Sequence, residues 1–190
     1  MAKPITIGQG ILPINRDQPF DPAKFIGEEG WTIEEQDKRS LALRQLDLTK
    51  VRLEHMLRER ETDPTGGTIR EGETFIKGEE KLKRLKEAGH IRLDAKVFQT
   101  LWENQAFIPE SWKGKVSVYF DGTVLRTPAD PVGHRPVWGP FGHRCVLCLS
   151  WRAGQWHWAY VWLECEWCAE FFSAVLSHRP WWKFWVFQKK

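Results

Sequence analysis

The chain has 190 residues, of which 42% are apolar and 28% charged, a composition that indicates a globular protein and excludes a disordered one. The formal net charge is +3: residues 1–113 carry 19 Lys/Arg against 20 Asp/Glu, and residues 114–190 carry nine against five. This charge is too small to predict nucleic-acid binding. No stretch has the roughly 18 apolar residues of a membrane helix, and the N-terminus lacks a basic and then apolar leader, so we expect a cytoplasmic protein.

Residues 1–30 are rich in Pro and Gly and predict an extended arm. A helix is expected next, because Thr32 and Glu35 form the capping box T-I-E-E. The leucines that follow recur at intervals typical of an amphipathic helix that runs to about residue 59. They are Leu41, Leu46, Leu48, Leu53 and Leu57.

Two further helices are expected over 78–88 and 94–105. Gly89 supplies the C-terminal stop of the first helix, and Asp94 supplies the N-cap of the second. Along the first helix lysines alternate with glutamates, which predicts a solvated helix face. These residues are Lys77, Glu79, Glu80, Lys81, Lys83, Lys86 and Glu87.

The sequence becomes β-rich after these helices. VSVYF (116–120) and TVLR (123–126) flank Asp121-Gly122, a tight-turn signal that predicts a hairpin. The Pro- and Gly-rich stretch 127–142 predicts a loop.

A second pair of strands is predicted by CVLCLSW (145–151) and QWHWAYVWL (155–163), which flank a short turn. The expected fold class is therefore α+β. A helical module over 31–113 precedes a small Trp-rich antiparallel β-sheet over 114–176, and a Trp-rich tail occupies 177–190.

Cys145, Cys148, Cys165 and Cys168 form two Cys-x-x-Cys pairs that stand 16 residues apart, the spacing of a zinc ribbon. Zinc ligands of this kind usually lie on tight turns, and neither pair contains Gly or Pro. Cys145 and Cys148 also differ by three positions within a predicted strand, so their side chains should point to opposite faces. The local sequence favours buried or incidental cysteines, with a zinc ribbon as the alternative.

The second strand of the later pair alternates strictly between two kinds of residue. One set is aromatic: Trp156, Trp158, Tyr160 and Trp162. The residues between them are His157, Ala159 and Val161. Because side chains alternate across a strand, the aromatics should share one face and the other three residues the opposite face.

The stretch 145–176 contains W-x-x-G-Q-W-x-W-x-Y-x-W-L-E-x-x-W-x-A followed by S-A-V-L. This pattern resembles the variable region of proteins that are diversified by diversity-generating retroelements. In such systems a reverse transcriptase mutates template adenines, so Asn codons change while TGG, the Trp codon, does not. Residues 91–113 and the FDGTVLR stretch (120–126) also resemble the region that precedes such repeats.

The resemblance assigns a role to each matched position. The variable, ligand-binding positions would be Arg152, Ala153, His157, Ala159, Val161, Cys165, Glu166, Cys168, Glu170 and Phe171. The constant scaffold would be Trp151, Gly154, Gln155, Trp156, Trp158, Tyr160, Trp162, Leu163, Trp167 and Ala169. The chain departs from the pattern at three positions: Glu166 and Glu170 cannot arise from an Asn codon, and Phe172 stands where Pro is expected.

The resemblance implies a protein that binds another protein or macromolecule, with this sequence being one variant among many specificities. It also implies a reduced C-type-lectin-like fold. No catalytic motif or cofactor-binding motif is present in the sequence, so we expect neither an enzyme nor a cofactor. Two alternatives remain. Three helices and a hairpin could form a nucleic-acid-binding winged helix, and the tail WWKFWVFQKK (181–190) could attach to a membrane surface.

Overall fold

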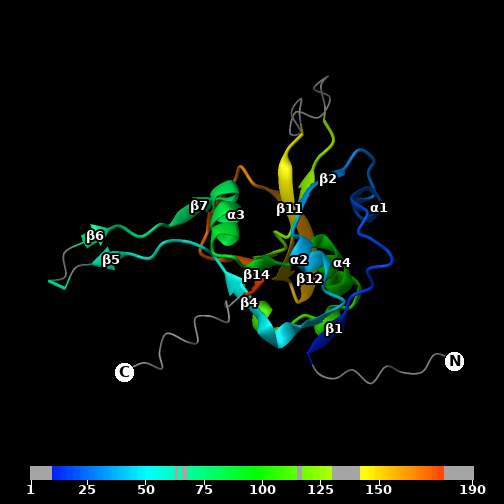
Figure 1. The fold of residues 1–190 in the computed structure, drawn as a ribbon, viewed down its shortest axis with the longest axis horizontal. Coiled ribbons are helices and arrows are strands. Elements are labelled where there is room, and N and C mark those ends of the chain that lie inside the picture. The colour runs from blue at the N-terminus through cyan, green and yellow to red at the C-terminus, as the bar shows by residue number, and fades with distance from the viewer. Residues whose placement is uncertain (1–9, 63, 66–67, 115–116, 130–141, 178–190) are drawn as a thin grey trace.

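The computed structural model describes residues 10–62, 64–65, 68–114, 117–129 and 142–177, and within these ranges its centre is an eight-stranded mixed sheet (Figure 1). This large sheet contains β2 (Thr32–Gln36), β4 (Val51–Glu54), β8 (Ile91–Arg92), β9 (Ser117–Tyr119), β10 (Thr123–Arg126), β11 (Arg144–Arg152), β12 (Gln155–Trp162) and β14 (Phe171–Leu176). The strand order is β2-β10-β11-β9-β14-β4, with β12 beside β11 and β8 beside β14. β9 and β14 run parallel, and the other pairs are antiparallel.

Shorter elements surround the large sheet. The two-stranded ribbons are β1 (Ile11–Pro13) with β3 (Gln45–Asp47), β5 (Glu61–Thr62) with β6 (Thr68–Arg70), and β7 (Phe75–Lys77) with β13 (Glu166–Cys168). The helices are α1 (Pro22–Ile26), α2 (Lys38–Leu41), α3 (Gly78–Glu87) and α4 (Ala95–Glu103), with short 3₁₀ turns η1 (Leu48–Lys50), η2 (Gln105–Phe107) and η3 (Glu110–Trp112). The β5–β6 ribbon projects away from the body of the molecule (Figure 1).

The side chains of β11 divide the interior into two cores. Cys145, Leu147 and Leu149 point into the large core, which also contains Phe98 of α4. The alternate β11 residues point the other way into the small core, which is made of Ile76, Leu82, Tyr119, Val124, Val146, Cys148, Leu163 and Trp167. Accordingly, α3 and α4 lie on opposite sides of β11 (Figure 1).

The predicted fold class is wrong, because the segment expected to form the first helix is mostly β-structure. β2 pairs with β10, and β4 pairs with β14, so strands from both predicted halves of the chain share one sheet. The leucine spacing marks burial and not a helix: Leu46 and Leu48 are buried in the large core although they do not share a helix. Pairing with distant strands overrides the local helical pattern.

The arm expected over 1–30 is also incorrect for the described residues 10–30. They form β1 and α1, and Leu12, Ile14 and Phe20 are buried in the large core. These apolar side chains are too widely spaced to give a helical or strand period. Their burial therefore depends on the sheet against which they pack.

The two later helices are confirmed as α3 and α4. The Asp94 carboxylate accepts hydrogen bonds from the Lys96 and Val97 backbone N–H groups at 2.8 and 3.1 Å, as expected of an N-cap. The solvated face predicted for α3 is wrong at Lys81, which is fully buried. Alternating charge on a helix does not show which lysine will face a sheet.

Asp121-Gly122 does not close a hairpin. β9 and β10 each pair with β11, on the edge opposite to β12. Gly122 N–H donates to the Leu93 carbonyl at 2.9 Å, and a Cβ at Gly122 would lie 2.2 Å from the Arg92 carbonyl oxygen. Glycine is required here because β8 approaches the chain closely, a reason that a local turn signal does not contain.

The β11–β12 hairpin is confirmed in position and direction, and its register is continuous. Every residue from Cys145 to Arg152 has a partner between Gln155 and Trp162. Ala153 and Gly154 join the strands with φ of 49° and 79°. Two left-handed residues are the geometry of a type I′ turn, which matches the twist of a hairpin.

Candidate ligand-binding surface

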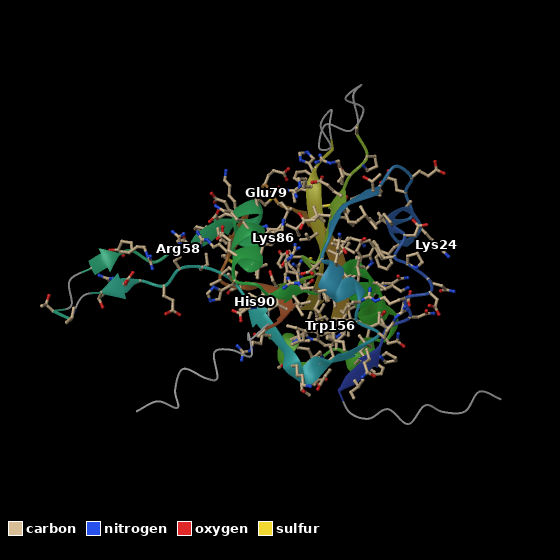
Figure 2. The ribbon with its side chains drawn as sticks, in the orientation of Figure 1. Lys24, Arg58, Glu79, Lys86, His90 and Trp156 are labelled. Carbon is tan, nitrogen blue, oxygen red and sulfur yellow. The ribbon has the colours of Figure 1, made fainter. Side chains whose placement is uncertain are left out.

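The aromatic residues of β12 face the large core, as the alternation predicts. Trp156 is 6% exposed (Figure 2). Trp158, Tyr160 and Trp162 pack as half-buried residues against the same core. The Trp158 ring centroid lies 4.9 Å from that of Phe25 on α1. These contacts fix β12 from one side only.

Trp31 and His143 contribute further rings to this packing. The Trp31 ring meets Tyr160 edge-on at 4.8 Å, and His143 stacks on Trp162 at 4.3 Å. Trp151, at the end of β11, is half-buried and meets Trp156 at 5.2 Å. The scaffold residues therefore receive ring contacts from segments far apart in the sequence.

The opposite side of the hairpin, its outer face, carries Arg152, His157, Ala159 and Val161. Ala159 and Arg152 are exposed, and His157 and Val161 are half-buried. Ala159 lies opposite Cys148 and His157 opposite Ser150, so the outer face continues the side of β11 that points to the small core. Val161 itself packs against the small core.

β13 brings further predicted variable residues to the neighbouring surface. Its Trp167 is buried and stacks on Tyr119 at 4.3 Å, whereas Cys165 and Glu166 are exposed and Cys168 is half-buried. Cys168 lies opposite Phe75 of β7, which is 58% exposed. Nothing in the local sequence marks Phe75 as a neighbour of this surface.

Tyr119 connects the hairpin with β13 and β14. It is opposite Cys148 in the sheet, and its ring meets that of Phe171 at 5.8 Å. The structure thus brings Cys168 and Phe171 close to the outer face through one buried ring. Ala153 is exposed in the β11–β12 turn, and Glu170 is exposed in the β13–β14 turn. Phe172 lies on the other side of β14, beside His55.

We define the candidate surface as the ten predicted variable positions, all of which are exposed or half-buried. They are Arg152, Ala153, His157, Ala159, Val161, Cys165, Glu166, Cys168, Glu170 and Phe171. Among the remaining scaffold positions, Gly154 completes the hairpin turn, Trp167 anchors β13 and Leu163 is buried, whereas Gln155 and Ala169 are exposed.

Two buried residues with side chains of opposite charge type, Lys81 and Asp121, lie beneath the candidate surface. The Lys81 Nζ donates to the Phe171 carbonyl at 2.6 Å and lies 5.3 and 5.0 Å from the ring centroids of Tyr119 and Trp167. Burial lowers the pKa of Lys81 to about 8, and the charge of Asp121 opposes this shift. Burial raises the pKa of Asp121, which is opposed chiefly by Lys81. The hydrogen bond from Lys81 to the Phe171 carbonyl joins α3 to the start of β14.

Ion pairs hold the outer part of α3 to the sheet. Lys86 bonds to Glu35 of β2 at 2.7 Å, and Arg92 bonds to the same carboxylate at 3.0 Å. Glu79 pairs with Arg144 of β11 (Figure 2). The expected capping residue Glu35 thus serves a tertiary contact.

The cysteines do not converge on one point. Cys145 lies in the large core and Cys148 in the small core, on opposite faces of β11, as expected from their spacing. Burial raises the pKa of each thiol to about 12, which disfavours the thiolate that zinc requires. Among the described residues no group of three or more His, Cys, Asp or Glu is placed to hold a metal ion. The geometry required of a zinc ribbon is not formed.

The winged-helix interpretation lacks its structural basis. It required three consecutive helices and a hairpin wing, but the first helix is replaced by strands, and β9 and β10 pair with β11.

The membrane-attachment interpretation concerned 181–190, which lie outside the described residues. No helix in the described part of the chain is long and apolar enough to cross a membrane.

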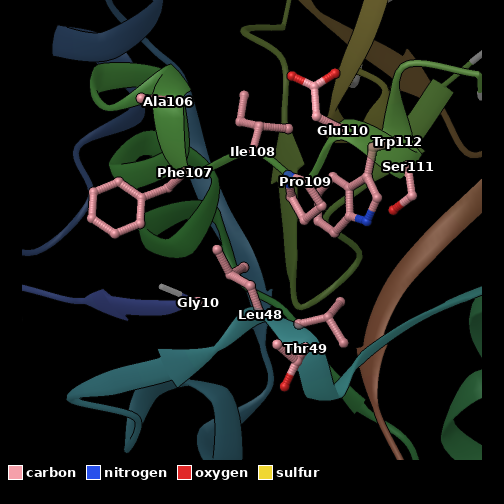
Figure 3. Close-up of a pocket in the computed structure, with 11 residues that line it drawn as sticks. Gly10, Leu48, Thr49, Ala106, Phe107, Ile108, Pro109, Glu110, Ser111 and Trp112 are labelled. Carbon is pink, nitrogen blue, oxygen red and sulfur yellow. The ribbon is translucent and has the colours of Figure 1, made fainter. Parts of the chain in front are cut away.

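An open cleft of about 680 Å³ lies between the η1 region and the η2–η3 segment (Figure 3). Its walls include Leu48, Phe107, Ile108 and Trp112, with Glu110 as the one charged residue among those lining it. No sequence signal predicted this cleft. Thr49 and Ser111 add hydroxyl groups to a mostly apolar wall, and no histidine is among the residues that line the cleft.

Comparison of the chain with protein-family models, with curated proteins and with solved structures gives no match.

Proposed function

We propose that this protein is a ligand-binding protein, not an enzyme, that recognises another protein or macromolecule through the candidate surface. The observation that supports this most directly is the division of β12 into two faces. Trp156, Trp158 and Tyr160 pack against the large core, while His157 and Ala159 take no part in that packing. Substitutions at His157 and Ala159 should therefore leave the contacts of the aromatic scaffold unchanged.

Such an arrangement suits a recognition surface physically. A strand that is already ordered loses little conformational entropy on binding, so more of the contact energy appears as affinity. Arg152 and His157 offer charge and hydrogen bonds, and Phe171 offers a ring, which are the side-chain types that dominate paratopes. Val161 and Phe171 also pack against the small core, so they should tolerate fewer residue types than Ala159.

The proposal includes diversification by a retroelement, which rests on the sequence resemblance. The genomic test is to locate a reverse-transcriptase gene and a near-copy of the 145–176 coding region beside this gene. Differences between the copies should fall at template adenines. Differences scattered over other template bases would contradict the retroelement.

The binding part of the proposal has its own test. A display library that randomises the ten positions of the candidate surface should remain folded in most members and should yield binders to purified test proteins. The matched control library randomises exposed residues of the β5–β6 ribbon, which should remain folded but yield fewer binders. A candidate-surface library that is largely unfolded, or that gives no more binders than the control, would contradict a recognition role.

A further inference from the structure

The edge of β12 that faces away from β11 pairs with no other strand in the described part of the chain. The strand pairs with β11 over eight consecutive residues. Its sequence, QWHWAYVW, contains no Asp, Glu, Lys, Arg, Pro or Gly, and its register is continuous.

The other outer strands of the large sheet differ from β12. β2 carries Glu34 and Glu35 and has an irregular register opposite Val124 and Leu125. β4 is shorter and carries Arg52 and Glu54. Charges, irregular pairing and short length are the features that prevent a sheet edge from pairing with another chain. β12 has none of them.

The direction of the backbone groups on this edge follows from one hydrogen bond. The Leu163 N–H donates to the Arg144 carbonyl at 2.9 Å, next to the pair Cys145–Trp162. Hydrogen-bonded and non-hydrogen-bonded pairs alternate in an antiparallel ladder, so Val161, Ala159 and His157 bond to β11. The N–H and C=O groups of Trp156 and Trp158 therefore point away from β11.

We infer that β12 pairs antiparallel with β12 of a second copy of this chain, about a two-fold axis normal to the sheet. Two-fold pairing requires that residues whose backbone N–H and C=O groups point away from β11 face the same kind of residue in the second copy. In β12 these are alternate residues of one strand, so this requirement can be met. Because β12 carries no Asp, Glu, Lys or Arg, self-pairing brings no such like charges together. β12 is held in register by β11, so it needs no ordering before it pairs.

Dimerisation of this kind does not depend on the proposed ligand-binding function, but it extends that function. A two-fold axis normal to the sheet keeps the two outer faces on the same side of one continuous sheet. The dimer would therefore present two candidate surfaces together, and a ligand with two matching sites would bind with avidity.

The test is the mass of the full chain by sedimentation equilibrium across a concentration series, with the variant Ala159→Lys. A lysine in the middle of an edge strand opposes pairing with a second copy, so the dimer dissociation constant should rise by about tenfold or more. Ala42→Lys, which makes the same change at an exposed residue outside the sheet, should leave the dissociation constant unchanged. Circular dichroism and thermal unfolding establish that both variants are folded.

Amide hydrogen exchange identifies the edge directly. The amides of Trp156 and Trp158 should become more protected as the wild-type protein dimerises. A wild-type chain that stays monomeric, or a dimer that Ala159→Lys does not weaken, overturns the inference. Concentration-independent protection of these two amides in a monomer would assign the edge to another occupant and overturns it equally.

Discussion

The β11–β12 hairpin and the segment 31–54 reach the same sheet in different ways. Within the hairpin each strand residue pairs with a residue close by along the chain, across the Ala153–Gly154 turn. In the segment 31–54, β2 pairs with β10 and β4 with β14, both far along the chain. The hairpin therefore carries much of its own structural information, whereas the earlier segment obtains its conformation from distant partners.

This difference has a physical origin. In the hairpin the turn residues, the alternation and the strand lengths all favour one arrangement, so local and global preferences agree. In the segment 31–54 the leucine spacing fits a helix, but strand pairing and burial of Leu46 and Leu48 contribute more free energy than helix propensity.

The largest expected effect is at Gly122, whose backbone bonds to Asp37, which follows β2, and to Leu93, which follows β8. Gly122→Ala places a Cβ 2.2 Å from the Arg92 carbonyl oxygen, and the Gly122 carbonyl accepts the Asp37 N–H that follows β2. We expect a loss of more than about 4 kcal/mol of unfolding free energy, measured by urea denaturation, because backbone must shift at this site. Gly114→Ala, which would meet no atom within 4 Å, should be close to neutral. A folded Gly122→Ala with wild-type stability would refute the close approach.

The next effect separates the two faces of the hairpin. Trp156→Ala should lower the unfolding free energy by about 3–5 kcal/mol, because it removes a large buried ring. His157→Ala, on the outer face, should change it by no more than about 0.5 kcal/mol. Both are measured by chemical denaturation. Equal losses from the two variants would contradict the division of β12 into scaffold and surface.

The third largest effect is expected at Lys81, the buried lysine of α3. Lys81→Met removes the buried positive charge that favours the ionised Asp121, which costs about 3 kcal/mol or less, since Asp121 has a raised pKa and can bind a proton. Lys83→Met, at an exposed position of the same helix, is the control and should be nearly neutral. Asp121→Asn combined with Lys81→Met should recover part of the loss.

The same lysine gives a pH signature. Its folded pKa of about 8 lies below its ordinary value of 10.5, so between these values the unfolded chain binds more protons. This group therefore makes the unfolding free energy rise as pH increases from about 8 to 10.5. Denaturation curves across this window should show a smaller rise in Lys81→Met, and identical slopes would place Lys81 in solvent.

The smallest effect is expected at Glu73, which follows the β5–β6 ribbon in the chain and pairs with Arg84 of α3. Hydrogen bonds from Arg84 hold the pKa of Glu73 at about 2, below its ordinary 4.5. This stabilisation is present above pH 4.5 and is lost as pH falls toward 2. Glu73→Gln should lose about 1 kcal/mol at neutral pH and should show a weaker acid dependence. Glu71→Gln, which is more exposed, provides the comparison by acid titration of unfolding.

Strand periodicity predicts the orientation of the candidate-surface residues only along β12, whereas the other positions were predicted from the sequence resemblance. Strand alternation places His157 and Ala159 opposite the tryptophans, because this period is a property of every strand. The proximity of Phe75 and the burial of Lys81 depend on the pairing of β7 with β13 and on the packing of α3. No local pattern contains these contacts.

The sequence by itself determined the hairpin, its turn, the later helices and the opposite orientation of Cys145 and Cys148, because each depends on neighbours along the chain. The tertiary structure alone decided that 31–54 forms strands, that Gly122 supports a crossing of segments, and that Lys81 is buried. These outcomes depend on contacts between distant residues, whose free energy of burial and pairing exceeds local preference.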